Sequence, residues 1–213
     1  MNDNKAKLFV VSAPSGCGKG TILSEVLQIK KFHYSVSCTT REPREGEVHG
    51  ENYFFIDKNK FEEMIANNEF LEYACFASNY YGTPEKAVRE NLEKGIDIVL
   101  EIETQGAFQI KKAMPEAVLV FILPPSVKEL NRRLNKRGTE DEDVILKRLS
   151  EAKGELQKAS AYDYVIMNDG LEEAVEDFIT VFDSAKNEDS KADRFKPSNE
   201  ETKKMIDEVL KNA

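Results

Sequence analysis

The chain has 213 residues, and its 39 acidic and 30 basic side chains give a formal net charge of -9. This length predicts one substantial core with small lobes, because it is too short for two full independent domains. A general nucleic-acid binder or an anionic-membrane binder needs a basic face, so the acidic balance argues against both functions. An anionic small substrate would require basic side chains that are concentrated locally.

The cysteines Cys17, Cys38 and Cys75 have neither paired nor metal-ligand spacing. They favour reduced thiols in a reducing compartment over a disulfide or zinc framework. Residues 1–7 are polar, and the apolar run behind them has only the length of a strand. This pattern predicts neither a secretory signal nor a membrane span, so we expect a cytoplasmic protein.

The first predicted elements are a strand, a glycine-rich turn and a helix. Residues 8–11 form a short apolar run typical of a buried strand, and apolar side chains recur at helical spacing over 19–30. β-rich patches over 34–55 surround a polar segment, and a helix over 58–67 and a strand over 70–76 follow. We interpret this second region as a small inserted lobe.

Strands and helices alternate in the second half of the chain. Pro84 favours the start of a helix, and Gly95 favours its end. Ser126 can cap the next helix, which Gly138 and Thr139 would break. The predicted strands are 96–102, 117–123 and 164–167, and the predicted helices are 84–93, 126–136, 142–159 and 171–182. This alternation is typical of an α/β fold with a parallel sheet.

The turn after the first strand carries a phosphate-binding pattern. Residues 12–21 read SAPSGCGKGT, close to the P-loop pattern G-x-x-x-x-G-K-[ST], between a strand and a helix as that motif requires. Backbone N–H groups of such a loop point at phosphate oxygens, and the helix N-terminus adds positive charge. We expect Lys19 to reach the β- and γ-phosphates. The residues expected to bind ATP here are Ala13, Pro14, Ser15, Gly16, Cys17, Gly18, Lys19, Gly20 and Thr21.

Two positions depart from the strict pattern. Ala13 stands where the first glycine is expected, and Gly20 stands where a Ser or Thr normally contacts magnesium, with Thr21 one residue later. We therefore expect the protein to touch Mg²⁺ through Thr21 or largely through waters. A turn that merely needs small residues is the alternative, but it gives no reason for a lysine where the helix dipole disfavours cations.

A second motif resembles a known family. Residues 35–54 read SVSCTTREPREGEVHGENYF, which closely resembles the guanylate kinase signature S-x-x-T-R-x-P-R-x-G-E-x-x-G-x-x-Y. Further family motifs follow in order at 70–73, 79–83, 101–106, 137–140 and 147–149, so the resemblance covers residues 7–183. It implies ATP-dependent phosphorylation of GMP, and of dGMP, to GDP, which serves GMP recycling and guanine nucleotide synthesis.

The chemistry of these motifs suits GMP. Arg41 and Arg44 can converge on a monophosphate with planar, multi-donor hydrogen bonds. Glu72 matches the family position that accepts from guanine N1–H and the 2-amino group, whereas adenine has an acceptor at N1 and no 2-amino group. The residues that the resemblance implies for GMP binding are Ser37, Arg41, Arg44, Glu47, Tyr53, Glu72, Tyr81, Gly82, Thr83, Glu101, Glu103 and Arg148.

Glu101 lies at the carboxyl end of the predicted strand 96–102, where α/β folds place ligand-facing residues, and it is a candidate for organising Mg²⁺-bound water. The family more often has Asp at the position of Glu103, which leaves the contact of that carboxylate open. Arg133, Arg137 and Arg148 lie in helices that we interpret as a lid, the alternative being a salt-bridged helical surface.

Compensation of charge during in-line transfer is the expected catalytic task. We expect Arg133 and Arg137 to bind ATP. The expected catalytic residues are Lys19, Arg41, Arg137 and Arg148.

The expected fold is α/β: a P-loop NTPase-type parallel sheet flanked by helices, with an inserted mixed α+β GMP-binding lobe and a helical lid. The expected guanylate kinase-like domain is 5–184, with its core at 5–34, 84–125 and 160–184, the lobe at 35–83, the lid at 126–159, and a tail or peripheral helix at 185–213. We expect ATP and Mg²⁺ as cofactors, GMP or dGMP as substrate, no nucleic-acid or membrane partner, and a monomer or homodimer.

Two rival functions share this scaffold. A catalytically silent guanylate-kinase-like module would bind phosphopeptides, but the complete loop with Gly16, Gly18 and Lys19 argues against it. A kinase of another small phosphorylated substrate is the second rival, and the segment 41–53 together with Glu72 argues against that one.

Overall fold

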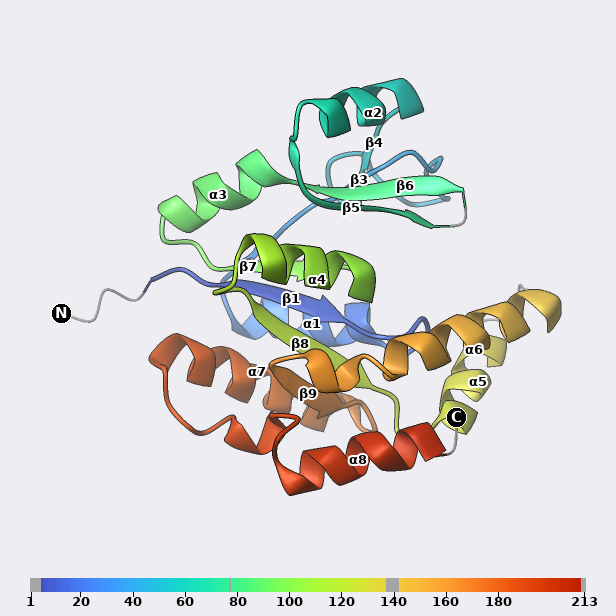
Figure 1. The fold of residues 1–213 in the computed structure, drawn as a ribbon, viewed down its shortest axis with the longest axis vertical. Coiled ribbons are helices and arrows are strands. Elements are labelled where there is room, and N and C mark those ends of the chain that lie inside the picture. Colours follow the sequence, from blue (N-terminus) through green and yellow to red (C-terminus); the bar gives the residue numbers. More distant parts are fainter. Residues whose placement is uncertain (1–4, 77, 137–141, 212–213) are drawn as a thin grey trace. The chain divides into compact units, whose positions relative to one another are not determined.

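The computed structural model describes residues 5–76, 78–136 and 142–211. Its helices and strands are labelled along the chain in Figure 1. The chain divides into two compact units. The first comprises the residues up to Val10 and Phe32–Ala117, and the second comprises Val11–Lys31 and the residues from Val118 onward. Strand β1 (Leu8–Ser12) contributes to both units, which are described separately below.

The larger sheet is parallel wherever its register is defined. Its strand order is β2-β7-β1-β8-β9, with β2 (His33–Tyr34), β7 (Ile98–Glu101), β8 (Val118–Leu123) and β9 (Tyr164–Met167). His33 pairs with Ile98 in the first unit, and Val120 pairs with Tyr164 in the second. All residues of β1 and β8 are buried, which explains their continuous apolar runs, because a parallel sheet is covered on both faces.

The first unit also contains a smaller sheet with the order β4-β3-β6-β5. These strands are β3 (Cys38–Thr39), β4 (Phe54–Phe55), β5 (Phe70–Phe76) and β6 (Asn79–Pro84), and the helices of this unit are α2 (Lys58–Ala66), α3 (Glu85–Glu93) and α4 (Thr104–Ala113). Strand β6 is antiparallel to both of its neighbours, β3 and β5. The ring of Phe61 stacks on Phe70 and on Tyr80, with centroid distances of 4.4 and 5.2 Å, and fastens α2 to this sheet.

The second unit is rich in helices. They are α1 (Lys19–Ile29), α5 (Val127–Lys136), α6 (Glu142–Leu156), α7 (Leu171–Asn187) and α8 (Glu200–Lys211), with short 3-10 turns η1 (Ala159–Ala161) and η2 (Asp193–Phe195). Helix α1 packs against α7, and the Lys30 ammonium lies 2.7 Å from Asp183 between them. Ser126 caps α5 as predicted, since its Oγ accepts from the Glu129 backbone N–H at 3.0 Å.

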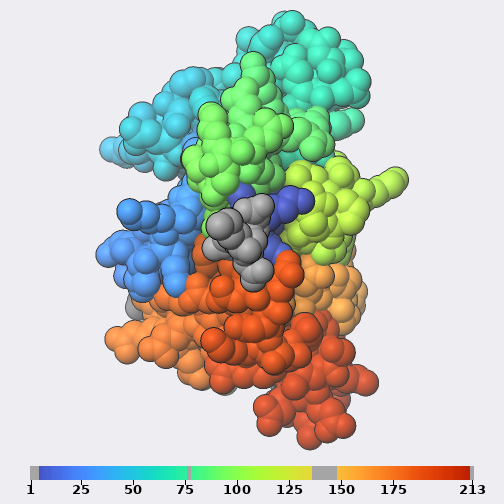
Figure 2. All heavy atoms as spheres, turned by 90° about the vertical axis from the view of Figure 1, so that its left-hand side faces the viewer, coloured from blue at the N-terminus to red at the C-terminus, as the bar shows by residue number. Residues whose placement is uncertain are grey.

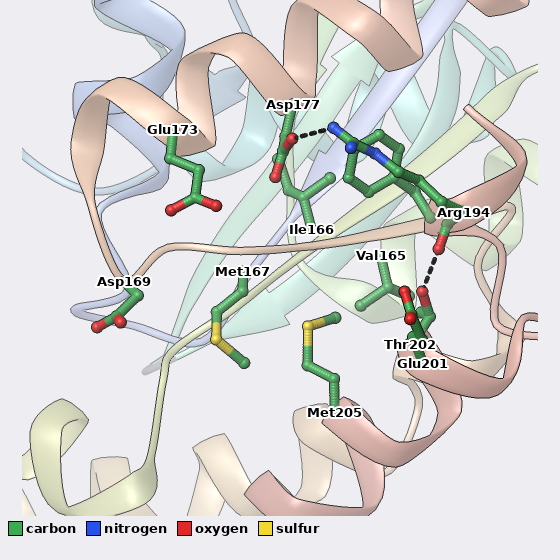
Figure 3. A pocket seen from close by; sticks show the side chains of 11 residues that line it. Val165, Ile166, Met167, Asp169, Glu173, Asp177, Arg194, Glu201, Thr202 and Met205 are labelled. Carbon is green, nitrogen blue, oxygen red and sulfur yellow. Dashed lines mark hydrogen bonds and ion pairs between the residues drawn. The ribbon is translucent and has the colours of Figure 1, made fainter. Parts of the chain in front are cut away.

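The C-terminal segment forms a packed helix. Thr202, Ile206 and Val209 of α8 are buried, and so is Phe195 of η2. In Figure 2 this segment, in red, lies on the surface beside the orange segment that carries α7, and the Arg194–Asp177 ion pair at 3.0 Å joins the two segments. A cavity of about 310 Å³ opens between β9, α7 and α8, with the thioethers of Met167 and Met205 on its wall (Figure 3).

Most predicted elements are confirmed, and several differ at their ends. The strands 70–76 and 164–167 match β5 and β9 residue for residue. The predicted strand 96–102 is longer than β7, because Gly95 has a φ of +77° and Ile96 is exposed. Helix α7 runs five residues beyond its predicted end at Phe182, and α6 ends at Leu156, before the predicted end at 159.

Two elements escape prediction from sequence. Strand β6, with the sequence NYYGTP, has a glycine and a proline and no apolar alternation, so it is a strand because it pairs on both sides. Helix α4, with the sequence TQGAFQIKKA, has a glycine in its first turn and lies between two predicted strands. Pro84 precedes α3 as its N-cap, one residue before the helix itself begins at Glu85.

Within the described ranges, none of the helices combines the length and the apolar character needed to cross a bilayer.

Candidate nucleotide-binding sites

The phosphate-binding loop takes its shape from two glycines. Gly16 and Gly18 both have a φ of +88°, a left-handed conformation that L side chains rarely adopt. A Cβ on Gly18 would lie 2.6 Å from Asn168 Nδ2, and a Cβ on Gly16 would lie 2.8 Å from Leu134 Cδ2. Ala13 is buried and does not adopt a positive φ, which explains why alanine fits where the motif expects its first glycine.

Hydrogen bonds to the Cys17 backbone hold the loop in place. Its N–H donates to the Pro14 carbonyl at 3.0 Å, and its carbonyl accepts from Asn168 Nδ2 at 2.6 Å. Arg133 Nη1 lies 3.5 Å from the same carbonyl, and Arg133 Nη2 donates to the Asn168 carbonyl at 3.2 Å. Arg133 is therefore braced against the loop, and Glu129 anchors its Nε at 2.8 Å.

The Cys17 side chain has a packing role. Its Sγ lies 3.5 Å from the Ile122 carbonyl, and burial raises the pKa of the thiol to about 12, although Arg133 and Lys19 act in the opposite direction. The thiol stays protonated at neutral pH, so it is a poor nucleophile.

The start of α1 is suited to an anion. Gly18 is its N-cap, no side chain caps the helix, and its first turn contains no acidic residue. The backbone N–H groups of a first helical turn have no acceptor within the helix, and they carry the positive end of the helix dipole. Lys19 is the first residue of α1, with Gly20 and Thr21 exposed behind it. This geometry suits binding of a phosphate group.

A second group of candidate residues lies in the first unit. Arg41 Nη2 lies 2.9 Å from both carboxylate oxygens of Glu47, and its guanidinium carbon is 5.7 Å from the centroid of the Tyr53 ring. The ring of Tyr53 in turn meets that of Tyr81 edge-on at 6.0 Å. Glu47 also accepts from the Arg44 backbone N–H at 2.8 Å, so this carboxylate orients the arginine loop.

Glu72 lies on β5 opposite Thr83 of β6, and only 4% of its surface is exposed. Its Oε1 accepts from Thr83 Oγ1 at 2.7 Å. Burial raises the pKa of Glu72 to about 6, and the hydrogen bonds from Thr83 lower it in part. Gly82 allows close packing on the neighbouring aromatic rings, because a Cβ there would lie 2.9 Å from Phe70 Cδ1 and 3.1 Å from the Glu72 carbonyl.

The raised pKa of Glu72 predicts a pH-dependent affinity for GMP. If Glu72 receives guanine N1–H and the 2-amino group, as the resemblance implies, the ionised carboxylate is needed and affinity should fall as pH drops through about 6. At pH 5 the dissociation constant should be about tenfold higher than at pH 8, measured by calorimetric titration. The GMP phosphate also titrates near pH 6, so the Glu72→Gln variant serves as the control. An equal pH dependence in both proteins would contradict this role of Glu72.

Glu101 ends β7, and Tyr34 Oη of the adjacent strand β2 donates to its Oε2 at 2.5 Å. Burial and the Glu101 charge raise the pKa of Tyr34, so its hydroxyl stays a neutral donor. Glu103 is exposed at the N-cap of α4 and makes no side-chain cap hydrogen bond. Ser37 is partly exposed, and its carbonyl accepts from the Phe54 N–H at 2.9 Å.

The expected site residues thus fall into two clusters. The loop cluster, which comprises residues 13–21 and Arg133, lies in the second unit. The lobe cluster lies in the first unit and comprises Ser37, Arg41, Arg44, Glu47, Tyr53, Glu72 and 81–83. Arg148 lies on α6 and is partly buried, and Arg137 lies outside the described residues. Sequence reasoning missed Asn168 and Tyr34. Asn168 directly follows β9, and that place at a strand's carboxyl end was the available signal. Within the described part of the chain, no three His, Cys, Asp or Glu side chains gather as a metal site.

A parallel α/β sheet whose first strand leads through a glycine-rich loop into a helix defines a P-loop nucleotide-binding protein. A protein-family model described as guanylate kinase matches residues 5–185. The chain belongs to the guanylate kinase family.

Relatives and a solved structure agree with this assignment. The chain is 52% identical to a guanylate kinase of Carboxydothermus hydrogenoformans, covering 86% of this chain and 90% of the relative. It is 49% identical to a guanylate kinase of Thermus thermophilus, covering 85% and 81%. The crystal structure of guanylate kinase from Anaplasma phagocytophilum matches with a TM-score of 0.73 and 34% identity, covering 86% of this chain and 88% of that one.

Proposed function

We propose that this chain transfers the γ-phosphoryl group of ATP directly and in line to GMP or dGMP, with the loop cluster holding ATP and the lobe cluster holding the acceptor. The overall reaction, conversion of GMP to GDP with ATP as the donor, follows from its membership of the guanylate kinase family. The observation that carries acceptor choice is the buried Glu72 carboxylate, held by Thr83 in the lobe cluster.

On the ATP side, the loop amides and the start of α1 receive the phosphates, and Lys19 neutralises the β- and γ-phosphates. The loop residues are Ala13, Pro14, Ser15, Gly16, Cys17, Gly18, Gly20 and Thr21. Arg133 fits an ATP-binding role because it already lies against the loop at Cys17. Arg137 and Arg148 complete the positive charge as catalytic residues, and 126–159 acts as a lid that excludes water.

On the GMP side, Arg41 and Arg44 hold the monophosphate, with the hydroxyls of Tyr53 and Tyr81 as neutral donors. Glu47 supports this site by fixing Arg41 at 2.9 Å. Glu72 and Thr83 read the guanine edge together with Ser37, and Gly82 belongs to the same acceptor site. Glu101, Glu103 and Arg148 complete the acceptor site.

Magnesium fits this donor set only if the ion keeps most of its waters. Glu101 and Thr21 are the protein groups proposed to touch its hydration shell, and the described residues hold no cluster of three ligating side chains. Bound to the phosphates, Mg²⁺ would neutralise charge that develops during transfer. The tyrosine hydroxyl on Glu101 would keep one carboxylate oxygen oriented.

Phosphoryl transfer needs little covalent work from the protein. A GMP phosphate oxygen is already anionic, so it attacks the γ-phosphorus without a general base, and the bond to the bridging oxygen of ADP breaks. Lys19, Arg41, Arg137 and Arg148 would compensate the charge on the transferred group.

The proposed organisation is a core at 5–34, 84–125 and 160–184, a GMP-binding lobe at 35–83, the lid, and a peripheral segment from 185 onward. We further propose a cytoplasmic enzyme that acts as a monomer or homodimer in GMP recycling, with no nucleic-acid or membrane partner.

The acceptor range of the purified protein tests this function. ADP formation from ATP should be fast with GMP and dGMP and close to the no-acceptor background with AMP, UMP and dTMP. Preference for another monophosphate would indicate a different kinase on the same scaffold. Background rates with every acceptor would instead favour a catalytically silent binding module.

A further inference from the structure

Helix α4 passes close to the Glu72 carboxylate at Gly106. Gly106 is buried in the first turn of this helix. A Cβ built on it would lie 2.4 Å from Glu72 Oε2, 2.9 Å from Glu72 Cδ and 3.3 Å from Ile102 Cδ1. Real Cβ atoms essentially never approach another heavy atom within 3.0 Å, so any side chain here would displace the carboxylate.

The backbone of Gly106 gives no other reason for glycine. Gly106 is not among the glycines with a positive φ, so its conformation is open to every L residue. Glycine inside a helix costs about 1 kcal/mol relative to alanine, which would favour replacement at this position. The lack of a side chain at Gly106 is therefore explained by the nearby Glu72 carboxylate and not by the backbone conformation.

The opposite side of the carboxylate is fixed as well. Thr83 Oγ1 donates to Oε1 at 2.7 Å, while Oε2 lies against the bare backbone of Gly106. A methyl group on residue 106 would force the Glu72 carboxylate to rotate. Because Oε1 and Oε2 belong to one rigid group, this rotation would strain or break the hydrogen bond from Thr83 to Oε1.

Helix α4 is also tied to β5 immediately beyond Glu72. The Gln109 side chain accepts from the Tyr73 N–H at 3.3 Å and donates to the Tyr73 carbonyl at 3.0 Å. Ala107 and Ile110 are buried on the same helix. Since backbone hydrogen bonds and core packing restrain α4, the flexible end of the Glu72 side chain would move first.

We propose that Gly106 is a positioning residue that sets guanine specificity by leaving the Glu72 carboxylate its place beside Thr83. The proposal rests on the guanine-reading role proposed above for Glu72. A displaced carboxylate loses its paired contact with N1–H and the 2-amino group. Discrimination against IMP, which lacks the 2-amino group, should then weaken along with GMP affinity.

The Gly106→Ala variant tests this proposal by calorimetric titration with GMP, IMP and ATP. We expect GMP affinity to fall about tenfold or more, because a hydrogen bond to a charged group is lost. The ratio of GMP to IMP affinity should fall as well, while ATP affinity and the melting temperature stay near those of the parent. Gly170→Ala is the matched control, since Gly170 is exposed, lacks a positive φ and has no heavy atom beyond its chain neighbours within 4 Å of its Cβ position.

A double mutant separates this proposal from the one on which it rests. In the Glu72→Gln background, Gly106→Ala should add no further loss of GMP affinity or of GMP-over-IMP discrimination. If Glu72→Gln leaves GMP affinity intact, the proposed role of Glu72 itself fails. If Glu72→Gln weakens GMP binding and Gly106→Ala does not, or if Gly106→Ala weakens ATP equally, the positioning role of Gly106 is overturned.

Discussion

Replacing Lys19 with alanine should lower kcat/KM for phosphoryl transfer by a factor of about one hundred or more, equivalent to ~3 kcal/mol of transition-state stabilisation. Lys19 begins α1 directly after the two glycines that shape the loop. In the proposed function its ammonium neutralises the β- and γ-phosphates, where charge builds up during transfer. Steady-state kinetics with saturating GMP and varied ATP measures the effect.

Lys31→Ala is a suitable control for this experiment, because Lys31 is an exposed lysine just beyond the same helix. It removes the same charge from the chain without touching the loop. If Lys19→Ala turns over as fast as the control, the proposed role of Lys19 at the ATP phosphates is contradicted.

Glu72→Gln should weaken use of GMP by about a hundredfold to ten-thousandfold, because a site built to receive two donors then faces them with an amide. The glutamine oxygen can keep the Thr83 hydrogen bond, but its NH₂ group points a donor at a guanine donor. Buried neutral glutamine replaces a carboxylate whose pKa burial raises to about 6. For an acid with a raised folded-state pKa, ionisation opposes folding above that pKa, so the variant should be no less stable at pH 8.

Thermal unfolding at pH 8 and kinetics with varied GMP measure the two effects separately. Glu62→Gln on α2 is the control, since Glu62 is an exposed glutamate of the same unit. A loss of GMP use that merely follows a loss of stability would mean that Glu72 has a structural role only.

Local sequence patterns predict much of this fold. Continuous apolar runs identify β1 and β8, because their burial leaves no alternation to obscure them. Strand β6 could not be found in this way, since it depends on hydrogen bonds to β3 and β5, which its own residues do not encode. Helix α4 is likewise stabilised through its contact with β5, and its glycine lowers its local helical preference.

The candidate site shows the same difference between residues in local motifs and residues brought together by packing. The loop and the arginine segment are each contiguous in sequence, so their motifs predict Lys19, Arg41 and Arg44 from local patterns alone. Asn168 holds the Cys17 carbonyl across 151 residues of chain, and Gly106 meets Glu72 from another element. The place of Asn168 after a strand can be read from the sequence, but the partner that each of these residues contacts is set by packing between distant segments.

The loop cluster and the lobe cluster are proposed to bind different nucleotides, ATP and GMP, each through its own residues. Calorimetric titration of the parent, Lys19→Ala and Glu72→Gln with each nucleotide alone tests this division most directly. We expect a crossed pattern, in which Lys19→Ala weakens ATP and spares GMP, while Glu72→Gln weakens GMP and spares ATP. Equal weakening of both nucleotides by either variant would contradict it.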